Sequence, residues 1–363
     1  MLLADLNLIP SYDMLGLPMP AWLAQSLMAL TLALHWAFLS MTAGGAVAYV
    51  LFRRDSPGVP GPRRRALAAF LPLSLQTAMT LGIAPLLFVQ VLYGQFFYTA
   101  NILMGWVWLG LLVLMIVNFY MLYYAWHRTR TGRTAWLLGI AVLAHMAISA
   151  KILTANATLT QSPDAWAGFR AMGGLVPFMG DALFWPRWTM ALSALLGGGG
   201  LFVAIFLRAR AGDSTDAVRP PVGKALAVSH VGLAGAIAAG LWAAVRLPQA
   251  ARAALPGGAE AALPYAALGA AALTLLLTLL ARRSGSLAAL LAPAGTFLVA
   301  LLAVAGLRDA VRRAALAEHF RLASVPVHAQ WSSFSLFAVI LVLGLALMAY
   351  LVRLGFAPVP ERA

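Results

Sequence analysis

Long apolar runs constrain this sequence more than any other feature. Several of them exceed the roughly 20 residues that an α-helix needs to cross the hydrocarbon core of a bilayer. Only 10% of the 363 residues are charged and 62% are hydrophobic, whereas soluble domains carry about 25% charged residues. The sequence therefore predicts an all-α fold, a polytopic transmembrane helical bundle that forms one integral-membrane domain over residues 1–363.

Nine spanning helices are expected from the apolar runs and their polar breaks. They cover about Ala21–Phe52, Ala66–Gln95, Asn101–Trp126, Thr134–Asn156, Asp181–Leu207, Val222–Val245, Leu263–Leu280, Leu287–Leu307 and Trp331–Leu354. The first five helices occupy residues 20–208 and the last four residues 222–355. A loop from Thr158 to Gly180, rich in Pro, Gly and aromatic residues, joins the fourth helix to the fifth.

The basic residues predict the orientation of the bundle. The formal net charge is +14, and most of the 25 Lys and Arg residues fall in short loops on one side of the predicted helices. Such loops face the cytoplasm, so the N-terminus is expected in the periplasm and the C-terminus in the cytoplasm. The sequence indicates a multi-pass protein of the bacterial inner membrane, embedded in the lipid bilayer, and its positive charge does not indicate a nucleic-acid partner.

Several kinds of chemistry are absent from the sequence. There is no cysteine, which excludes disulfides, thiolate metal sites, iron–sulfur clusters and covalent c-type haem attachment in this chain. The predicted spans contain no well-buried Asp or Glu. A proton-driven pump or transporter normally needs such a group, so this absence argues against that class.

The segment 308–330 is expected outside the membrane. Asp309 and Arg313 stand at positions i and i+4, the spacing of a helical ion pair. We therefore expect the eighth helix to project beyond the bilayer as an exposed helix. The alternative is a docking surface for a periplasmic partner.

Small residues cluster in three of the predicted helices, at 43–46, 197–200 and 232–240. Small residues let helix backbones approach closely within lipid. They can equally leave room for a flat cofactor, but helix packing is the default interpretation.

Histidines inside the spans are the first candidates for a functional site. His35 lies midway along the first helix, His145 midway along the fourth, and His230 in the sixth. A neutral imidazole is a good axial ligand for haem iron, and it can equally be an interhelical hydrogen bonder. The two histidines on one helix that mark a b-type dihaem bundle are absent.

Two basic residues near the outer surface could act with such a site. Lys151 lies near the outer end of the fourth helix, where its stem can extend to the interface. It could instead pair with Asp181 or with a haem propionate. Arg187 begins the fifth helix, where it could hold a propionate or anchor the helix at the interface.

Three stretches of the first half resemble one family. They are ALHWAFLSMTAGGAVAYVLF at 33–52, TLGIAPLLFVQVLYGQFFYTANILMGWVW at 80–108 and HMAISAKILTANATLTQSPDAW at 145–166. Their order and spacing resemble subunit I of the cytochrome bd quinol oxidases over about residues 20–208. Nine helices with an external N-terminus also match that family. The resemblance implies a haem ligand at His35.

The departures from the family are equally informative. The two glutamates that the family needs at its oxygen site correspond to Asn101 and Leu109 here, and a low-spin haem ligand corresponds to Met190 or a neighbour. The quinol-binding loop after the sixth helix is missing. Oxygen reduction and quinol oxidation by that loop are therefore not expected, and whether the chain is an enzyme stays open.

Three functions follow as hypotheses. The first is a membrane subunit of a respiratory electron-transfer complex that binds haem b at His35, with Met190 or His145 as the second iron ligand. It would work with another membrane subunit, a quinone pool or a periplasmic cytochrome. The second is a haem-free structural or assembly subunit, and the third a secondary transporter, which predicts an internal repeat or intramembrane carboxylates.

Overall fold

The computed structural model of the protein describes residues 9–52, 61–131, 136–211, 215–253, 257–284 and 286–356. This part of the chain is all-α, and nine of its helices are long and apolar enough to cross a membrane. They are α1 (Ala21–Leu51), α2 (Gly61–Leu103), α3 (Gly105–Arg130), α4 (Trp136–Thr160), α6 (Phe184–Ala209), α7 (Thr215–Arg246), α9 (Leu263–Ser284), α10 (Leu287–Ala315) and α11 (Trp331–Phe356). The predicted fold class and the nine spans are confirmed.

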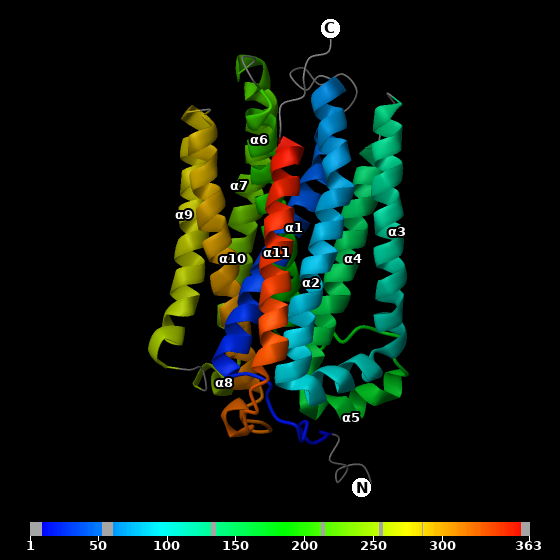
Figure 1. The fold of residues 1–363 in the computed structure, drawn as a ribbon, viewed down its shortest axis with the longest axis vertical. Coiled ribbons are helices and arrows are strands. Elements are labelled where there is room, and N and C mark those ends of the chain that lie inside the picture. Colours follow the sequence, from blue (N-terminus) through cyan, green and yellow to red (C-terminus); the bar gives the residue numbers. More distant parts are fainter. Residues whose placement is uncertain are drawn as a thin grey trace.

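The nine helices form one bundle whose long axes run side by side (Figure 1). The helix α1 begins at one end, called here the N-terminal end, and α11 finishes at the other. Short helices lie in the loops of the described chain: η1 (Pro163–Ala165), α5 (Trp166–Phe169), η2 (Arg170–Met172), α8 (Gln249–Ala253), η3 (Gly258–Ala262) and η4 (Leu322–Ser324).

The helices α1 and α6 form the middle of the bundle. α1 packs against α2, α4, α6 and α10, while α6 also packs against α7. α3 and α11 lie at the periphery, and α11 rests on α2, where the rings of Phe88 and Phe337 meet edge to face at 5.6 Å. The site described below lies between α1 and three of these neighbours, α2, α6 and α10.

Glycines allow the central helices to cross in contact. A methyl group on Gly44 of α1 would overlap the backbone of Gly199 on α6, and one on Gly197 would meet Leu233 of α7. The Ser229 hydroxyl of α7 donates to the Gly197 carbonyl at 2.8 Å. The interpretation of these small residues as helix contacts is confirmed.

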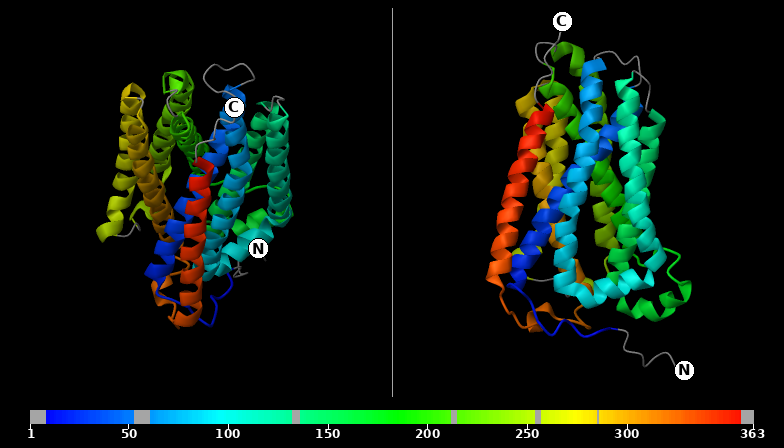
Figure 2. Two further views of the ribbon diagram at one scale, coloured as in Figure 1. Left: turned by 45° about the horizontal axis from the view of Figure 1, so that its top comes forward. Right: turned by 45° about the vertical axis from the view of Figure 1, so that its right-hand side comes forward.

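The break between the second and third helices, predicted after Gln95, lies further along the chain. The chain bends at Tyr93 (φ −140°, ψ 33°), but it stays helical to Leu103 instead of stopping at Gln95. The second piece of α2 runs across the N-terminal end of the bundle (Figure 2). Tyr93 and Phe96 are fully buried, because the bend turns these rings inward under the bundle.

The segment before α1 and the loop before α11 are joined by backbone hydrogen bonds. Leu17 N–H donates to the Pro326 carbonyl at 2.8 Å, and His328 N–H donates to the Leu17 carbonyl at 2.8 Å. Gly16 precedes this pair with φ +69°, a conformation that glycine adopts without strain. The contact closes the N-terminal end of the bundle beneath α1.

Candidate functional site

His35 lies where α1 meets α2. Its Nδ1 is 2.6 Å from the Ala78 carbonyl oxygen of α2. A carbonyl can only accept, so Nδ1 carries the proton and donates it. A Cβ on Gly82 would lie 2.8 Å from the same nitrogen, so glycine at 82 makes room for the ring.

The second imidazole nitrogen is left as an acceptor. The Nε2 atom of His35 makes no hydrogen bond with any residue in the described ranges. Histidines that ligate a metal commonly donate their other ring N–H to a carbonyl, which fixes the tautomer and the ring orientation. His35 therefore has the tautomer and the second-nitrogen contact of a ligating histidine.

Asp309 of α10 is the hub of a buried polar cluster near the N-terminal end. Its carboxylate accepts from Tyr93 Oη at 2.9 Å, Gln25 Nε2 at 2.8 Å, Arg312 Nη1 at 3.0 Å and Arg313 Nε at 3.2 Å. The Asp309 side chain is only 5% exposed. The predicted i,i+4 pair of Asp309 with Arg313 is confirmed.

The expectation of an exposed helix at 308–315 is wrong. α10 continues to Ala315, and Asp309 and Arg312 are both buried. The sequence showed four charges within six residues, which is typical of a helix leaving the membrane. Asp309 instead pairs with Arg312 and Arg313, and residues of α1 and α2 cover these groups. The statement that no span holds a buried carboxylate is wrong for the same reason, because Asp309 lies within the α10 span.

Arg312 is held by α1 and α2. Its guanidinium lies 5.0 Å from the centre of the Tyr93 ring, and its Nη1 lies 3.8 Å from Met28 Sδ. Its Nε is buried without a hydrogen-bond partner. Arg313 reaches the outer side of the cluster, where its Nη2 donates to Glu260 Oε2 at 2.6 Å.

Arg187 and Arg308 complete the cluster. Arg187 of α6 donates to Gln161 Oε1 at 2.9 Å. Arg308 is partly buried and lies within electrostatic range of Arg187, Arg312 and Asp309. Its guanidinium makes no hydrogen bond or ion pair with any described residue, although the charge of Arg308 also acts on His35.

Met190 is not brought to His35. α1 and α6 run in the same direction and touch at Gly44 and Gly199. His35 and Met190 each precede their glycine by nine residues, about two and a half helical turns, so they share a depth but point away from the α1–α6 contact. Consistent with this, Met190 Sδ lies beside Gly240 of α7, while His35 lies beside α2.

His145 and Lys151 also have other neighbours. His145 Nδ1 donates to the Ala141 carbonyl of its own helix at 3.1 Å. Lys151 Nζ lies 6.0 Å from the centre of the Trp185 ring, a cation–π distance. Asp181, one of the two alternative partners given for Lys151, accepts from Leu183 N–H at 2.7 Å, at the start of α6.

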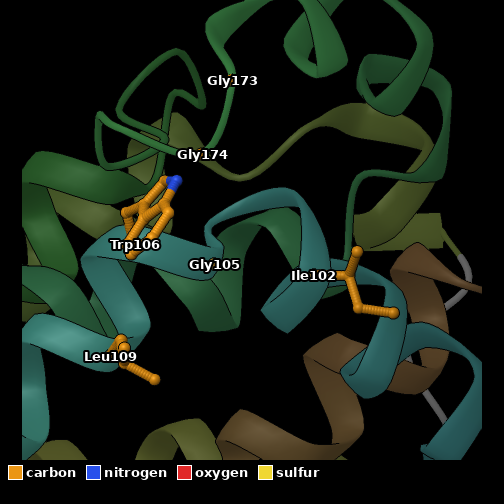
Figure 3. Close-up of a pocket in the computed structure, with 6 residues that line it drawn as sticks. All are labelled: Ile102, Gly105, Trp106, Leu109, Gly173 and Gly174. Carbon is orange, nitrogen blue, oxygen red and sulfur yellow. The ribbon is translucent and has the colours of Figure 1, made fainter.

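Asn101 and Leu109 supply no acidic group. Asn101 Oδ1 accepts from Asn156 Nδ2 at 2.7 Å, which ties the end of α2 to α4. Leu109 is 56% exposed on the outer face of α3. It lines an open pocket of about 280 Å³ with Ile102, Gly105, Trp106, Gly173 and Gly174 (Figure 3). Apolar side chains and glycine backbone line this pocket, so it offers no group for proton transfer.

Comparison of the sequence with known protein families and with curated proteins gives no match. Sequence reasoning found His35 and Arg187 but missed Arg308, Arg312 and Gln161. The signal that could have found them was the spacing of Arg308, Asp309 and Arg312, three charged residues within about one helical turn. If such a turn lies inside the bundle, its charges need ion-pair partners.

Proposed function

We propose that this polytopic membrane protein is a subunit of a respiratory electron-transfer complex that binds haem b at His35. It would exchange electrons with a quinone pool or another membrane subunit on one side and a periplasmic cytochrome on the other. This proposal follows the resemblance of residues 20–208 to subunit I of the cytochrome bd oxidases.

The observation that carries the proposal is the state of the His35 ring. Its Nδ1 is fixed by the Ala78 carbonyl, and its Nε2 has no partner among the described residues. The Nδ1 contact is sufficient to join α1 to α2, so a purely structural role would give Nε2 no task. The free acceptor nitrogen on a fixed ring supports a ligand role, and haem b is the group that fits a single imidazole in a cysteine-free chain.

The residues of this chain would have simple tasks in such a subunit. Haem b, when bound, supplies a reversible one-electron couple. His35 would hold the iron, the Ala78 carbonyl would fix the imidazole, and Gly82 would leave the ring its space. The surrounding apolar helices would keep water away from the couple.

Oxygen reduction is not part of the proposal. Asn101 is engaged with Asn156, and Leu109 faces outward from α3. Neither can deliver protons as a carboxylate does. The proposed role is therefore electron transfer without bond-breaking chemistry on oxygen.

The test is the haem content of three purified proteins: the wild type, His35→Ala and His145→Ala. The proposal predicts pyridine-haemochrome b in the wild type and in His145→Ala, and a loss of haem in His35→Ala. His145 is the matched control because it is also a partly buried histidine within a span. Haem retained at the wild-type level in His35→Ala would contradict the assignment.

One observation favours the alternative of a haem-free structural or assembly subunit. The His35–Ala78 contact joins α1 to α2 across 43 residues of sequence, as the hydrogen bond between the Thr42 and Ser74 hydroxyls does nearby. This alternative predicts a colourless wild-type protein in which His35→Ala lowers only thermal stability.

A further inference from the structure

The polar cluster near the N-terminal end contains donors without acceptors. Gln161 Nε2 and Arg312 Nε are buried and have no hydrogen-bond partner, and the Arg308 guanidinium has none among the described residues. Burying a donor without a partner is unfavourable, and more so when the donor is charged. Two such buried donors, beside the partly buried guanidinium of Arg308, indicate a missing acceptor.

The orientation of Gln161 is fixed by its neighbour. Arg187 can only donate, so the atom of Gln161 that it contacts at 2.9 Å must be the amide oxygen. The amide nitrogen is therefore the unpartnered end of a residue that is only 8% exposed. Exchanging the two amide atoms would place two donors face to face and would not remove the deficit.

The carboxylates of the cluster cannot supply the acceptor. Asp309 already accepts from four donors, and Glu260 is engaged by Arg313. Asp181 acts on Arg187 through its charge. Four arginines thus face three carboxylates, and at least one positive charge stays unbalanced. Buried charge normally has a partner.

The open donors lie close to His35 in depth. Arg312 contacts Met28 of α1, Arg308 lies one turn along α10 from Arg312, and His35 lies two turns along α1 from Met28. Because α1 and α10 run in opposite directions (Figure 1), Arg308 and His35 differ in depth by only about one turn, or roughly 5 Å. The charge of Arg308 accordingly acts on His35.

We infer that Arg308, Arg312 and Gln161, supported by Arg187, form an anion site that takes the carboxylates of the group bound at His35. The inference rests on the proposed function, which makes these carboxylates the propionates of haem b. Arginine suits the role because its planar fork binds a carboxylate through two hydrogen bonds. The propionate edge of the haem would then face the N-terminal end of the bundle, and Lys151 would take no part.

The test compares two ligands on the full-length chain, purified in detergent and stripped of haem. One ligand is haem b, and the other is its dimethyl ester, which lacks both carboxylate charges. A hydrogen bond to a charged group is worth about 1.5–3 kcal/mol, so esterification is expected to weaken binding to the wild type by about tenfold or more. Arg308→Gln should bind haem b about tenfold more weakly and should lose most of its preference over the ester.

Arg321→Gln is the matched control, because Arg321 is exposed at the same end of the bundle. It should bind both ligands as the wild type does. Equal affinity of the wild type for haem b and for the ester would overturn the inference, and this result needs no variant to fold. Such a protein would still bind haem, so the proposed function would stand.

The remaining outcomes are also decisive. A wild type that binds neither ligand would contradict the proposed function and the inference together. The same donors could hold the phosphate of a lipid headgroup. One result would be an anionic phospholipid that copurifies with the wild type but not with Arg308→Gln. If the wild type also bound the two haem ligands equally, the site would be assigned to lipid and its assignment to haem would be overturned.

Discussion

Asp309→Asn should destabilise the protein strongly, although the substitution changes only one atom. In the native protein the Asp309 carboxylate accepts four hydrogen bonds and faces Arg312 and Arg313. The side chains of Asp309 and Arg312 are 5% and 6% exposed. An amide cannot balance the arginine charges, and its nitrogen would face donors.

The expected magnitude follows from burial. Removing one partner of a buried ion pair costs about 3–5 kcal/mol, because the other charge stays buried without compensation. Asparagine keeps one acceptor oxygen, so we expect about 3 kcal/mol. The double variant Asp309→Leu with Arg312→Met should recover part of this loss, because it removes both buried charges.

The assay is reversible unfolding in mixed micelles, followed by circular dichroism during titration with sodium dodecyl sulfate. Asp164→Asn is the control, because Asp164 pairs with His319 at 3.3 Å while its own side chain is 86% exposed. That exposed pair should be worth less than about 1 kcal/mol. If Asp309→Asn unfolded at the same midpoint as Asp164→Asn, the reasoning from buried charge would be refuted.

Three further predictions concern packing, ligation and orientation. Gly199→Leu should prevent the protein from eluting as a monodisperse peak in size-exclusion chromatography, because the new side chain would overlap Gly44. Gly269→Leu, whose side chain would meet open space, should elute normally. Equal yields of the two variants would refute the close contact of α1 and α6 at these glycines. Met190→Ala should leave the visible spectrum of the haem unchanged, since Met190 points toward α7; a changed spectrum would restore it as a ligand. A tag at the N-terminus should be cleaved by protease added to intact spheroplasts, and protection would invert the predicted orientation.

The fold could be predicted because each spanning helix needs an apolar run long enough to match the thickness of the bilayer. The ninth helix was expected at Trp331–Leu354 and runs over Trp331–Phe356. Errors arose where the chain leaves the regular spans. The second helix is predicted to end at Gln95, but it continues to Leu103 because the bend at Tyr93 buries the aromatic rings.

The candidate site was predictable only in part. His35 could be found because a histidine is rare in an apolar helix. Its tautomer depends on the Ala78 carbonyl, 43 residues away, and no local pattern encodes that contact. The sequence predicts Arg308 and Arg312 outside the membrane, because a dense group of charges is typical of a helix end. Their burial depends on Gln25 and Tyr93, which reach Asp309 from distant parts of the sequence.

The visible absorption spectrum of the purified wild-type chain, reduced minus oxidised, tests the central claim most directly. The account predicts a b-type α-band and an integral haem content by pyridine haemochrome. A folded, monodisperse and colourless protein, which also failed to take up added haem b, would contradict it. The fixed imidazole of His35 would then be a helix contact, and the function would have to be sought in a haem-free role.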